Sequence, residues 1–384
     1  MLRVPIAPRH NLHDIARQCG FEFHTIDDEL YWDESAYYQF SLNQIENDLE
    51  DPTAELHQMC LDLVDDVVKS DELMQRLSIP TQYRDAVAKS WRDGHPTLYG
   101  RMDFSYDGRS PAKLLEYNAD TPTSLYEAGF FQWMWLENQV DAGKLSRASD
   151  QFNSIQEKLI ARFTDLNSIP LTFSCCKDTA EDRGTVEYLE DCARQGGAST
   201  DFIFIEDLGI NDQSQLVRLD DRPIQALFKL YPWEMMFEDE FGAYLKNCDN
   251  YFLEPMWKAI LSNKGILPLL WQRHQGHPNL LPAWFADDSP EVSVDCVKKP
   301  LFGREGANIS WLKQGQITQV SNDQGYGHEG YVIQQAQPLP QFDGNHTLIG
   351  SWIIANEPAG LTIREDKSAI TQDTSRFIPH IILD

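Results

Sequence analysis

The sequence predicts a mixed fold of the α+β or α/β class, and three features of its hydrophobic pattern support this. Residues 101–123 alternate apolar and polar side chains in two runs, as the strands of a β-hairpin do. Residues 170–206 read as a strand, a helix and a strand, which implies some parallel sheet. Residues 264–371 hold many short apolar runs between turn residues, the pattern of a sheet-rich region. With 384 residues, 42% of them hydrophobic, the chain is long enough for a large core.

The first hundred residues are expected to cover that core. The clearest helix begins near Asp51, because apolar residues from Leu56 to Val68 recur at i, i+3, i+4 and i+7. We expect Asp51 to cap this helix and Pro52 to occupy its first position. The expected elements, in order, are a helix at 11–19, strands at 21–26 and 29–32 around a turn at Asp27-Asp28, and helices at 51–70 and 81–99.

The hairpin places charged and amide side chains on one of its faces. With its turn at 107–111, Asp103 lies opposite Glu116 and Arg101 lies opposite Asn118, with opposed Cβ atoms about 5 Å apart. Carboxylate and amide oxygens suit Mg²⁺, and an arginine beside them can stabilise charge on a transferring phosphoryl group. The alternative is an amphipathic hairpin whose polar face is solvated and salt-bridged.

The segment 124–137 follows the hairpin at once and is apolar nearly all round, which predicts a buried helix. We expect Thr121, Thr123 or Ser124 to cap it, and Thr123 and Glu127 to face the polar side of the hairpin. A helix N-terminus there would attract an anion, although capping and ordinary packing also explain these residues. Further along, we expect a helix at 154–166, strands at 170–176 and 201–206 around a helix at 185–194, an acidic helix at 235–245 and a helix at 251–263.

The last third is predicted to be rich in strands and to carry two lysines. Lys264 precedes its first strand, and Lys299 ends its second, just before the glycine-containing loop 300–307. Backbone N–H groups of such a loop can bind phosphate oxygens, although the loop lacks the Walker spacing and the chain has no GxGxxG motif. The expected strands are 266–271, 293–299, 309–312, 316–321, 331–335, 347–355 and 369–371.

Bulk charge and cysteine content exclude several classes of partner. The net charge of −28 repels nucleic acid and anionic membranes, and it attracts small cations such as polyamines, although it also serves solubility. No signal peptide is evident, and no apolar run approaches the ~20 residues of a membrane span. The seven cysteines form no CxxC pair, which fits reduced thiols in the cytoplasm. Small molecules are the expected partners, and no stable protein partner is evident.

Several stretches together resemble a known family. LLEYNADTPTSLYEA, LFKLYPWE, KKPLFGREGANI and PAGLTIRED are similar to the synthetase domain of glutathionylspermidine synthases and to its stand-alone acid–amine ligase relatives, over about residues 20–370. The resemblance implies an ATP-grasp fold in a circularly permuted order, with the metal hairpin before the lysine-bearing strands. It also implies ATP, two Mg²⁺ ions, and an amide made from a small acid and an amine through an acyl phosphate. The chain starts at the synthetase, so no amidase activity is expected.

Residue roles follow from the match to the family motifs. The resemblance implies catalytic roles for three arginines, Arg101, Arg304 and Arg364, with surface salt bridges as the alternative for the last two. The implied Mg²⁺ ligands are Asp103, Glu116 and Asn118. The implied ATP contacts are Arg101, Met102, Asp103, Lys264, Lys299, Gly306, Gln334, Gln335, Ala336, Gln337, Ala369 and Ile370. The implied substrate contacts are Thr121, Thr123 and Glu127.

The chain is expected to form a single synthetase unit over residues 1–384. Its expected subdomains are a cover at 1–100, the hairpin and buried helix at 101–145, a βαβ-containing substrate part at 146–250 and an ATP-binding sheet at 251–384. Two other functions remain open from the sequence. One is an ATPase or carboxylate phosphotransferase without ligation, and the other is a non-catalytic nucleotide-binding module.

Overall fold

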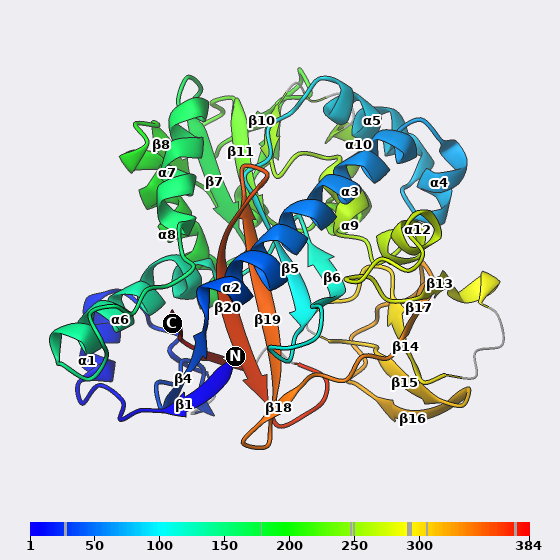
Figure 1. Ribbon diagram of the computed structural model, residues 1–384. Coiled ribbons are helices and arrows are strands. Elements are labelled where there is room, and N and C mark those ends of the chain that lie inside the picture. The colour runs from blue at the N-terminus through cyan, green and yellow to red at the C-terminus, as the bar shows by residue number, and fades with distance from the viewer. Residues whose placement is uncertain are drawn as a thin grey trace.

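The computed structural model describes residues 1–26, 29–177, 179–245, 248, 250–289, 294–304, 306–371 and 375–384. Helices and several separate sheets occur in mixed order along the chain, so the predicted mixed class is confirmed (Figure 1). The predicted turn at Asp27-Asp28 lies outside the described residues, and the strands on either side of it pair as an antiparallel hairpin.

A central antiparallel sheet is built from segments far apart in sequence. Its strands, in spatial order, are β21 (Arg376–Ile378), β20 (Glu357–Asp366), β19 (Asn345–Ile354), β5 (Tyr99–Ser105) and β6 (Lys113–Asn118), and β18 (Gln341–Phe342) pairs with β19. The predicted hairpin forms β5 and β6, and β5 pairs with β19, where Asp103 lies opposite Gly350. The last third of the chain therefore builds the sheet that carries the hairpin.

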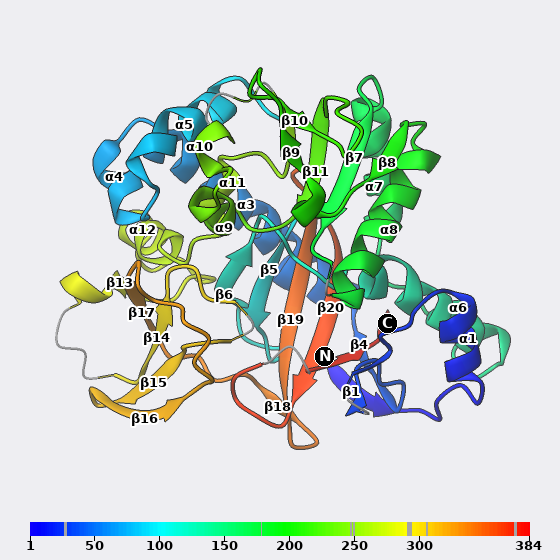
Figure 2. The same cartoon turned by 180° about the vertical axis from the view of Figure 1, so that it is seen from behind.

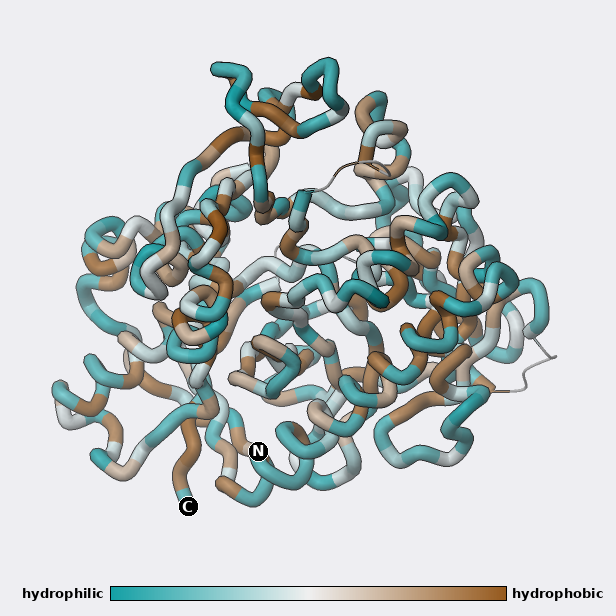
Figure 3. The backbone as a smooth tube through the Cα atoms, turned by 90° about the horizontal axis from the view of Figure 1, so that it is seen from above, coloured by the Kyte–Doolittle hydropathy of each residue, from teal (hydrophilic) through white to brown (hydrophobic). Residues whose placement is uncertain are grey.

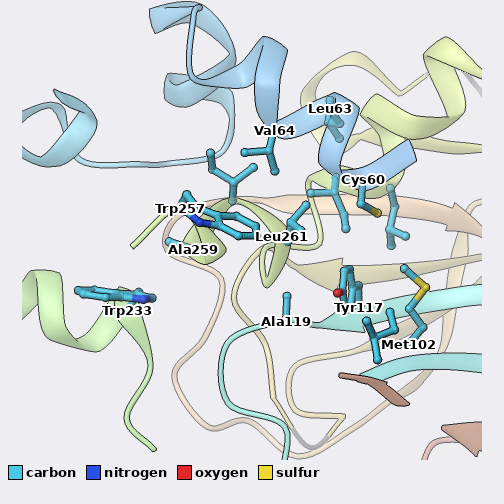
Figure 4. Close-up of a cluster of buried hydrophobic side chains, with 14 of the residues drawn as sticks. Cys60, Leu63, Val64, Met102, Tyr117, Ala119, Trp233, Trp257, Ala259 and Leu261 are labelled. Atoms are coloured by element: carbon cyan, nitrogen blue, oxygen red, sulfur yellow. The ribbon is translucent and has the colours of Figure 1, made fainter. Parts of the chain in front are cut away.

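Helix α3 (Asp51–Val67) crosses one face of this sheet (Figure 1). Met102 and Tyr117 project from the hairpin toward the apolar side of α3, where they join Cys60 and Leu63 in the main core (Figure 4). Because alternate strand residues point to opposite faces, the polar residues of the hairpin project from the other face. Figure 2 shows the backbone of the sheet from that side. Burial of the apolar face thus determines which face holds the charges.

The predicted helix is α3, which begins at Asp51 as expected, but the predicted cap is wrong. The chain enters helical conformation earlier, at α2 (Leu42–Ile45), where Ser41 and Gln44 form a reciprocal capping box. A π-helical turn at Glu46–Glu50 then leads directly into α3. Asp51 is therefore an interior helical residue rather than a cap.

A second antiparallel sheet lies beside the hairpin. Its order is β13 (Ala283–Phe285), β17 (Tyr331–Gln335), β14 (Cys296–Pro300), β15 (Ser310–Lys313) and β16 (Gln316–Val320). Four of these five strands lie where the sequence predicted strands. The expected strand at 266–271 is instead helix α12 (Ile266–Arg273), since a short apolar run fits a buried helix as well as a strand. The expected strand at 369–371 is not formed either.

A parallel sheet confirms the predicted βαβ unit. Its order is β12 (Tyr251–Leu253), β11 (Ala226–Leu230), β7 (Leu171–Cys175) and β8 (Thr200–Phe202), all parallel. Helices α7 (Ile155–Leu166) and α8 (Ala180–Gln195) pack beside it. The helix expected at 251–263 divides into strand β12 and the short helix α11 (Lys258–Leu261).

The two chain ends meet in a small sheet of β1 (Leu2–Pro5), β4 (Ala36–Phe40) and β22 (His380–Ile382). The remaining helices are α1 (Leu12–Gln18), α4 (Asp71–Arg76), α5 (Arg84–Arg92), α6 (Gln132–Asp141), α9 (Trp233–Glu238) and α10 (Gly242–Leu245). The remaining strands are β2 (Thr25–Ile26), β3 (Glu29–Leu30), β9 (Gly209–Ile210) and β10 (Leu216–Val217). Figure 3 shows hydrophilic segments in many of the outer loops. Within the described ranges, every helix is too short or too polar to cross a bilayer.

Candidate active site

The predicted register of the hairpin is confirmed where it matters for the site. Arg101 pairs with Asn118, and Asp103 pairs with Glu116. The register shifts just beyond Asp103, so that Phe104 pairs with Leu114. This irregularity was not predicted, because it depends on how the hairpin tip packs rather than on side-chain alternation.

Arg101 and Asp103 form a buried two-pronged ion pair. The Arg101 guanidinium donates from Nε to Asp103 Oδ1 at 2.7 Å and from Nη2 to Oδ2 at 3.0 Å, and Nη1 donates to the Thr123 carbonyl at 3.0 Å. The exposed fractions are 6% for Arg101 and 2% for Asp103. Asn118 Nδ2 donates to Asp103 Oδ2 at 3.2 Å and to Glu116 Oε1 at 3.3 Å. The two carboxylates and the amide therefore converge on one point of the sheet.

Lys264 reaches this cluster, although not from a strand. It lies in the turn that precedes helix α12, and its Nζ contacts Glu116 Oε2 at 3.0 Å and donates to the Gly303 carbonyl at 2.5 Å. The expectation that a strand follows Lys264 is wrong, but its predicted proximity to the carboxylates does not depend on that strand. Lys264 therefore connects the hairpin, through Glu116, to the glycine-containing loop, through Gly303.

Lys299 lies on strand β14, as predicted, and is buried. Its Nζ donates to the Leu115 carbonyl at 2.9 Å and to Gln334 Oε1 at 2.8 Å. Burial, reinforced by the nearby Lys264 charge, lowers the pKa of Lys299 to about 8 despite the attraction of Glu116. An anionic ligand would bind favourably beside Lys299. A second negative charge, added to that of Glu116, would raise the lysine pKa toward its ordinary value.

The two carboxylates are in different electrostatic environments. Burial raises the pKa of Asp103 even though Arg101 opposes the shift. Burial acts in the same direction on Glu116, but Lys264 and Lys299 outweigh it and lower the pKa of Glu116 to about 2. Glu116 is therefore ionised throughout the neutral range.

The two carboxylates, Asp103 and Glu116, and the two lysines line a cavity of about 750 Å³, a volume that includes its open mouth. The predicted residues that line it are Asp103, Glu116, Lys264, Lys299, Gly306, Gln334, Gln335, Gln337, Ala369 and Ile370. Lining residues that the sequence analysis missed are Leu115, Val297, Gly303, Ala307, Ile309, Trp311, Leu339, Leu348 and Thr371. Alternation along β14 could have indicated Val297, which lies two residues before Lys299 on the same strand face. The lining includes apolar side chains and a tryptophan, which suit a flat aromatic ring.

Gly306 is required by a close approach of two loops. Its φ is +70°, and a Cβ there would lie 2.5 Å from the Thr371 carbonyl oxygen and 2.9 Å from Ile370 Cγ2. The loop 300–307 therefore closes against the segment that contains Ala369 and Ile370. Glu305 of this loop lies outside the described residues.

Two predicted ATP contacts do not fit the structure. The Met102 side chain is fully buried in the core on the opposite face of the sheet, because strand alternation directs it toward α3. The Ala336 amide N–H already donates to the Asp295 carbonyl, so it is not free to donate to a base.

Gln334 uses its side chain to hold Lys299 and to donate to the Leu114 carbonyl. Its position fits support of the lysine.

The structure brings Arg304 and Thr121 together with Glu234, a residue for which the sequence predicted no role. Arg304 Nη1 donates to Thr121 Oγ1 at 2.7 Å, and Nη2 donates to Glu234 Oε1 at 2.9 Å. Glu234 lies on α9, far from the loop in sequence. The Thr121 hydroxyl thus accepts from the arginine rather than capping the following helix.

A second polar cluster lies beyond Arg101 and contains the predicted residues Glu127 and Arg364. Both Glu127 carboxylate oxygens are buried, and neither has a hydrogen-bond partner among the described residues. Burial and the neighbouring Glu181 raise the pKa of Glu127 to about 8. The Tyr31 hydroxyl donates to Glu181 Oε1 at 3.1 Å, and the Arg364 charge acts on Asp103 and on both glutamates. Tyr31 and Glu181 were not predicted.

The donor set on the hairpin fits magnesium. Asp103, Glu116 and Asn118 offer hard oxygen atoms, and the contacts of the Asn118 amide show that the three side chains meet. The amide now turns its Nδ2 toward both carboxylates, so ligation through Oδ1 requires a rotation of that group. Arg101 and Lys264 neutralise the same carboxylates in this structure.

Comparisons with known proteins identify the family of this chain. A family model described as "Glutathionylspermidine synthase preATP-grasp" matches residues 3–383. A Haemophilus influenzae protein described as "Putative acid--amine ligase" is 40% identical over 376 residues, which is 94% of this chain and 94% of the relative. The bifunctional glutathionylspermidine synthetase/amidase of Escherichia coli is 26% identical over 373 residues, 90% of this chain and 60% of the relative. Trypanothione synthetase of Crithidia fasciculata is 26% identical over 347 residues, 84% of this chain and 53% of the relative.

The three relatives are named as a putative acid–amine ligase and two synthetases, and the two synthetases extend well beyond the region matched by this chain. The chain belongs to the glutathionylspermidine synthase family.

Replacing Lys299 by methionine is expected to weaken ATP binding by about tenfold or more, because the predicted charged hydrogen bond to phosphate would be lost while the stem still packs. Calorimetric titration with ATP measures this. Lys258→Met is the matched control, since Lys258 is equally buried and pairs with Glu254 at 3.3 Å outside the cavity. Equal ATP affinity for Lys299→Met and the wild type would contradict the assignment.

Proposed function

We propose that this chain is an ATP-dependent acid–amine ligase that forms an amide through an acyl phosphate. The observation that carries the proposal is the convergence of two carboxylates, Asp103 and Glu116, with two lysines, Lys264 and Lys299, on one cavity wall. Family membership supports the use of ATP and Mg²⁺. The hairpin precedes both lysines in the chain, which supports an ATP-grasp arrangement in circularly permuted order.

The cavity suggests an orientation for ATP. The paired residues Val297 and Trp311 on the cavity lining suit the adenine ring, and the lysines suit the phosphates. Mg²⁺, with two ions expected, would be held by Asp103, Glu116 and Asn118 and would neutralise phosphate charge. The 300–307 loop would cover the phosphates and keep out water, which would otherwise hydrolyse an acyl phosphate.

The reaction proceeds by two displacements. A carboxylate oxygen of the acid attacks the γ-phosphorus of ATP, the bond to the β-phosphate oxygen breaks, and ADP leaves. The amine nitrogen then attacks the acyl carbon, the bond to the phosphate oxygen breaks, and inorganic phosphate leaves. Arg101, Arg304 and Arg364 would supply the positive charge that holds the acid and the transferring group.

The buried acidic cluster suits the amine. An amine arrives as an ammonium ion and must lose a proton before it can attack. Glu127 has two buried oxygens without hydrogen-bond partners among the described residues, and it lies beside Glu181. Thr121 and Thr123 would contact the substrates at the entrance to this cluster. We propose that Glu127 and Glu181 bind the ammonium group and that Glu127 accepts its proton.

Glu127→Gln is expected to slow amide formation by about 10²-fold, because general-base catalysis is lost, while acyl phosphate formation continues. The Glu127 carboxyl is protonated below its pKa of about 8, so the wild-type rate should rise as pH increases through 8, and the variant should lose this rise. The profile is measured at saturating Mg-ATP, where phosphate charge keeps Lys299 protonated. A variant that keeps the rise near pH 8 would exclude Glu127 as the acceptor.

A direct test of the function uses the wild-type protein with Mg-ATP and a cell metabolite extract. Glutathione as the acid and spermidine as the amine are the first defined substrates to test, because the name of the Escherichia coli relative combines the two. A mass-spectrometric product equal to acid plus amine minus water, with stoichiometric ADP and phosphate, supports ligation. ADP formation that no amine accelerates would indicate an ATPase or phosphotransferase, and ATP binding without turnover would indicate a binding module. The cysteines form no disulfide within the described part of the chain, which supports a cytoplasmic location.

A further inference from the structure

A fully buried ion pair lies behind Arg304, and the proposed chemistry does not use it. Asp120 and Lys229 both have side chains with 0% exposure, and Lys229 Nζ contacts Asp120 Oδ1 at 2.7 Å. Lys229 Nζ also donates to the Tyr231 carbonyl at 2.9 Å and lies 4.4 Å from the centre of the Trp233 ring. The pair joins the loop after β6 to strand β11.

Asp120 also holds the start of helix α9. Its second oxygen, Oδ2, accepts the backbone N–H of Trp233 at 2.8 Å. Trp233 is the first residue of α9, and the preceding Pro232 provides no side-chain cap. One carboxylate therefore uses its two oxygens on two separate elements, a strand and a helix. Figure 4 shows Trp233 on its helix, apart from the α3 contacts of the core.

The residues that follow these two anchors both bind Arg304. Thr121 follows Asp120 and accepts from Arg304 Nη1, while Glu234 follows Trp233 and accepts from Arg304 Nη2. The contacts close a ring from Asp120 through Trp233 and Glu234 to the arginine and back through Thr121. The orientation of the guanidinium thus depends on a group that does not touch it.

Stability alone does not explain this pair. Taking each of these charges out of water opposes folding unless the other charge compensates it. Apolar residues of similar volume often replace such a pair without loss of stability. What apolar residues cannot replace is a directed bond to the Trp233 amide.

We propose that Asp120 and Lys229 are a positioning pair that fixes Thr121 and Glu234, and through these two residues fixes the position of Arg304. The inference rests on the proposed function, because Arg304 acts on the reaction only if the chain is a ligase. Lys229 orients the Asp120 carboxylate through their 2.7 Å contact, and Asp120 sets the distance between the loop and α9.

The experiment compares two neutral replacements of the pair. Asp120→Leu/Lys229→Met is apolar and lacks the acceptor for the Trp233 amide. Asp120→Asn/Lys229→Gln retains an acceptor and a hydrogen-bonded partner. We expect the apolar pair to lower kcat by about 10²-fold with little change in KM for ATP, since small displacements of a catalytic group have effects of this size. We expect the hydrogen-bonded pair to recover most of that loss.

Two further measurements separate positioning from a structural role. In an Arg304→Ala background, the apolar pair should cause no additional loss of kcat, because it acts through that arginine. Glu254→Gln/Lys258→Met is the matched control, a buried pair whose loss should lower Tm without this dependence on Arg304. If the apolar pair does not fold, Asp120→Ser/Lys229→Gln takes its place, because serine is too short to reach the Trp233 amide.

Wild-type kcat in the apolar pair, or a loss that adds in full to that of Arg304→Ala, would overturn the inference. A crystal structure of the apolar pair gives a readout that needs no activity. Arg304 should lose its contacts to Thr121 or Glu234, and contacts that remain unchanged would also overturn the inference. Absence of ligation by the wild-type protein would instead count against the proposed function.

Discussion

Replacing Arg101 by alanine is expected to lower kcat by about 10³-fold while changing KM for ATP little, because an arginine that acts on the transferring phosphoryl group has effects of this size. Arg101 lies on the same strand face as Asp103 and is fixed by three hydrogen bonds, two to Asp103 and one to the Thr123 carbonyl. Its guanidinium is therefore oriented before any substrate binds, between the carboxylates proposed to hold Mg²⁺ and the acidic cluster.

The Arg101 test includes two companion variants. Arg101→Lys should recover little activity, because one ammonium group cannot reproduce the planar, two-pronged contact. Arg9→Ala is the matched control, since Arg9 is buried and bonded to Glu34 at 3.0 Å in a structural pair. It should lower Tm without a selective effect on kcat. A raised KM with unchanged kcat in Arg101→Ala would show that the residue binds ground-state ATP.

Glu116→Gln is expected to reduce ATP turnover by about 10²-fold and to raise the Mg²⁺ concentration needed for half-maximal rate, since a preorganised charge is lost. Lys264 and Lys299 lower the pKa of Glu116 to about 2, so the wild-type side chain is a full anion at every assay pH. Glutamine keeps the shape but leaves Lys264 without its anionic partner and removes the charge that attracts the metal.

The control for this variant is Glu365→Gln. Glu365 is fully buried and accepts from Arg3 Nε at 2.7 Å, in a network that joins the N-terminal strand to the central sheet. Its replacement should lower Tm and leave the Mg²⁺ dependence unchanged. If Glu116→Gln kept the wild-type Mg²⁺ dependence, the polar face of the hairpin would be a structural ion-pair network.

Local sequence patterns predicted individual strands and helices and the pairing of strands that are close in sequence. Alternation gave the hairpin strands and the pairing of Asp103 with Glu116, because side-chain direction in a strand has a fixed period of two. Periodicity also located α7 and the βαβ unit. It failed for the run at 266–271, where a six-residue apolar stretch fits a buried helix equally well. The predicted cap at Asp51 is wrong, because the chain is already helical before α3 and the capping box lies ten residues earlier, at Ser41.

The sequence by itself therefore determined the mixed fold class, the hairpin and the chemical types of its polar face. The tertiary structure decided which distant residues meet that face. Lys264 reaches Glu116 from a turn before a helix, Glu234 reaches Arg304 from α9, and Glu181 lies beside Glu127. The physical reason is that periodicity reports only the environment of one segment. Contacts between segments depend on how sheets and helices pack, and that packing is set by the burial of their apolar faces.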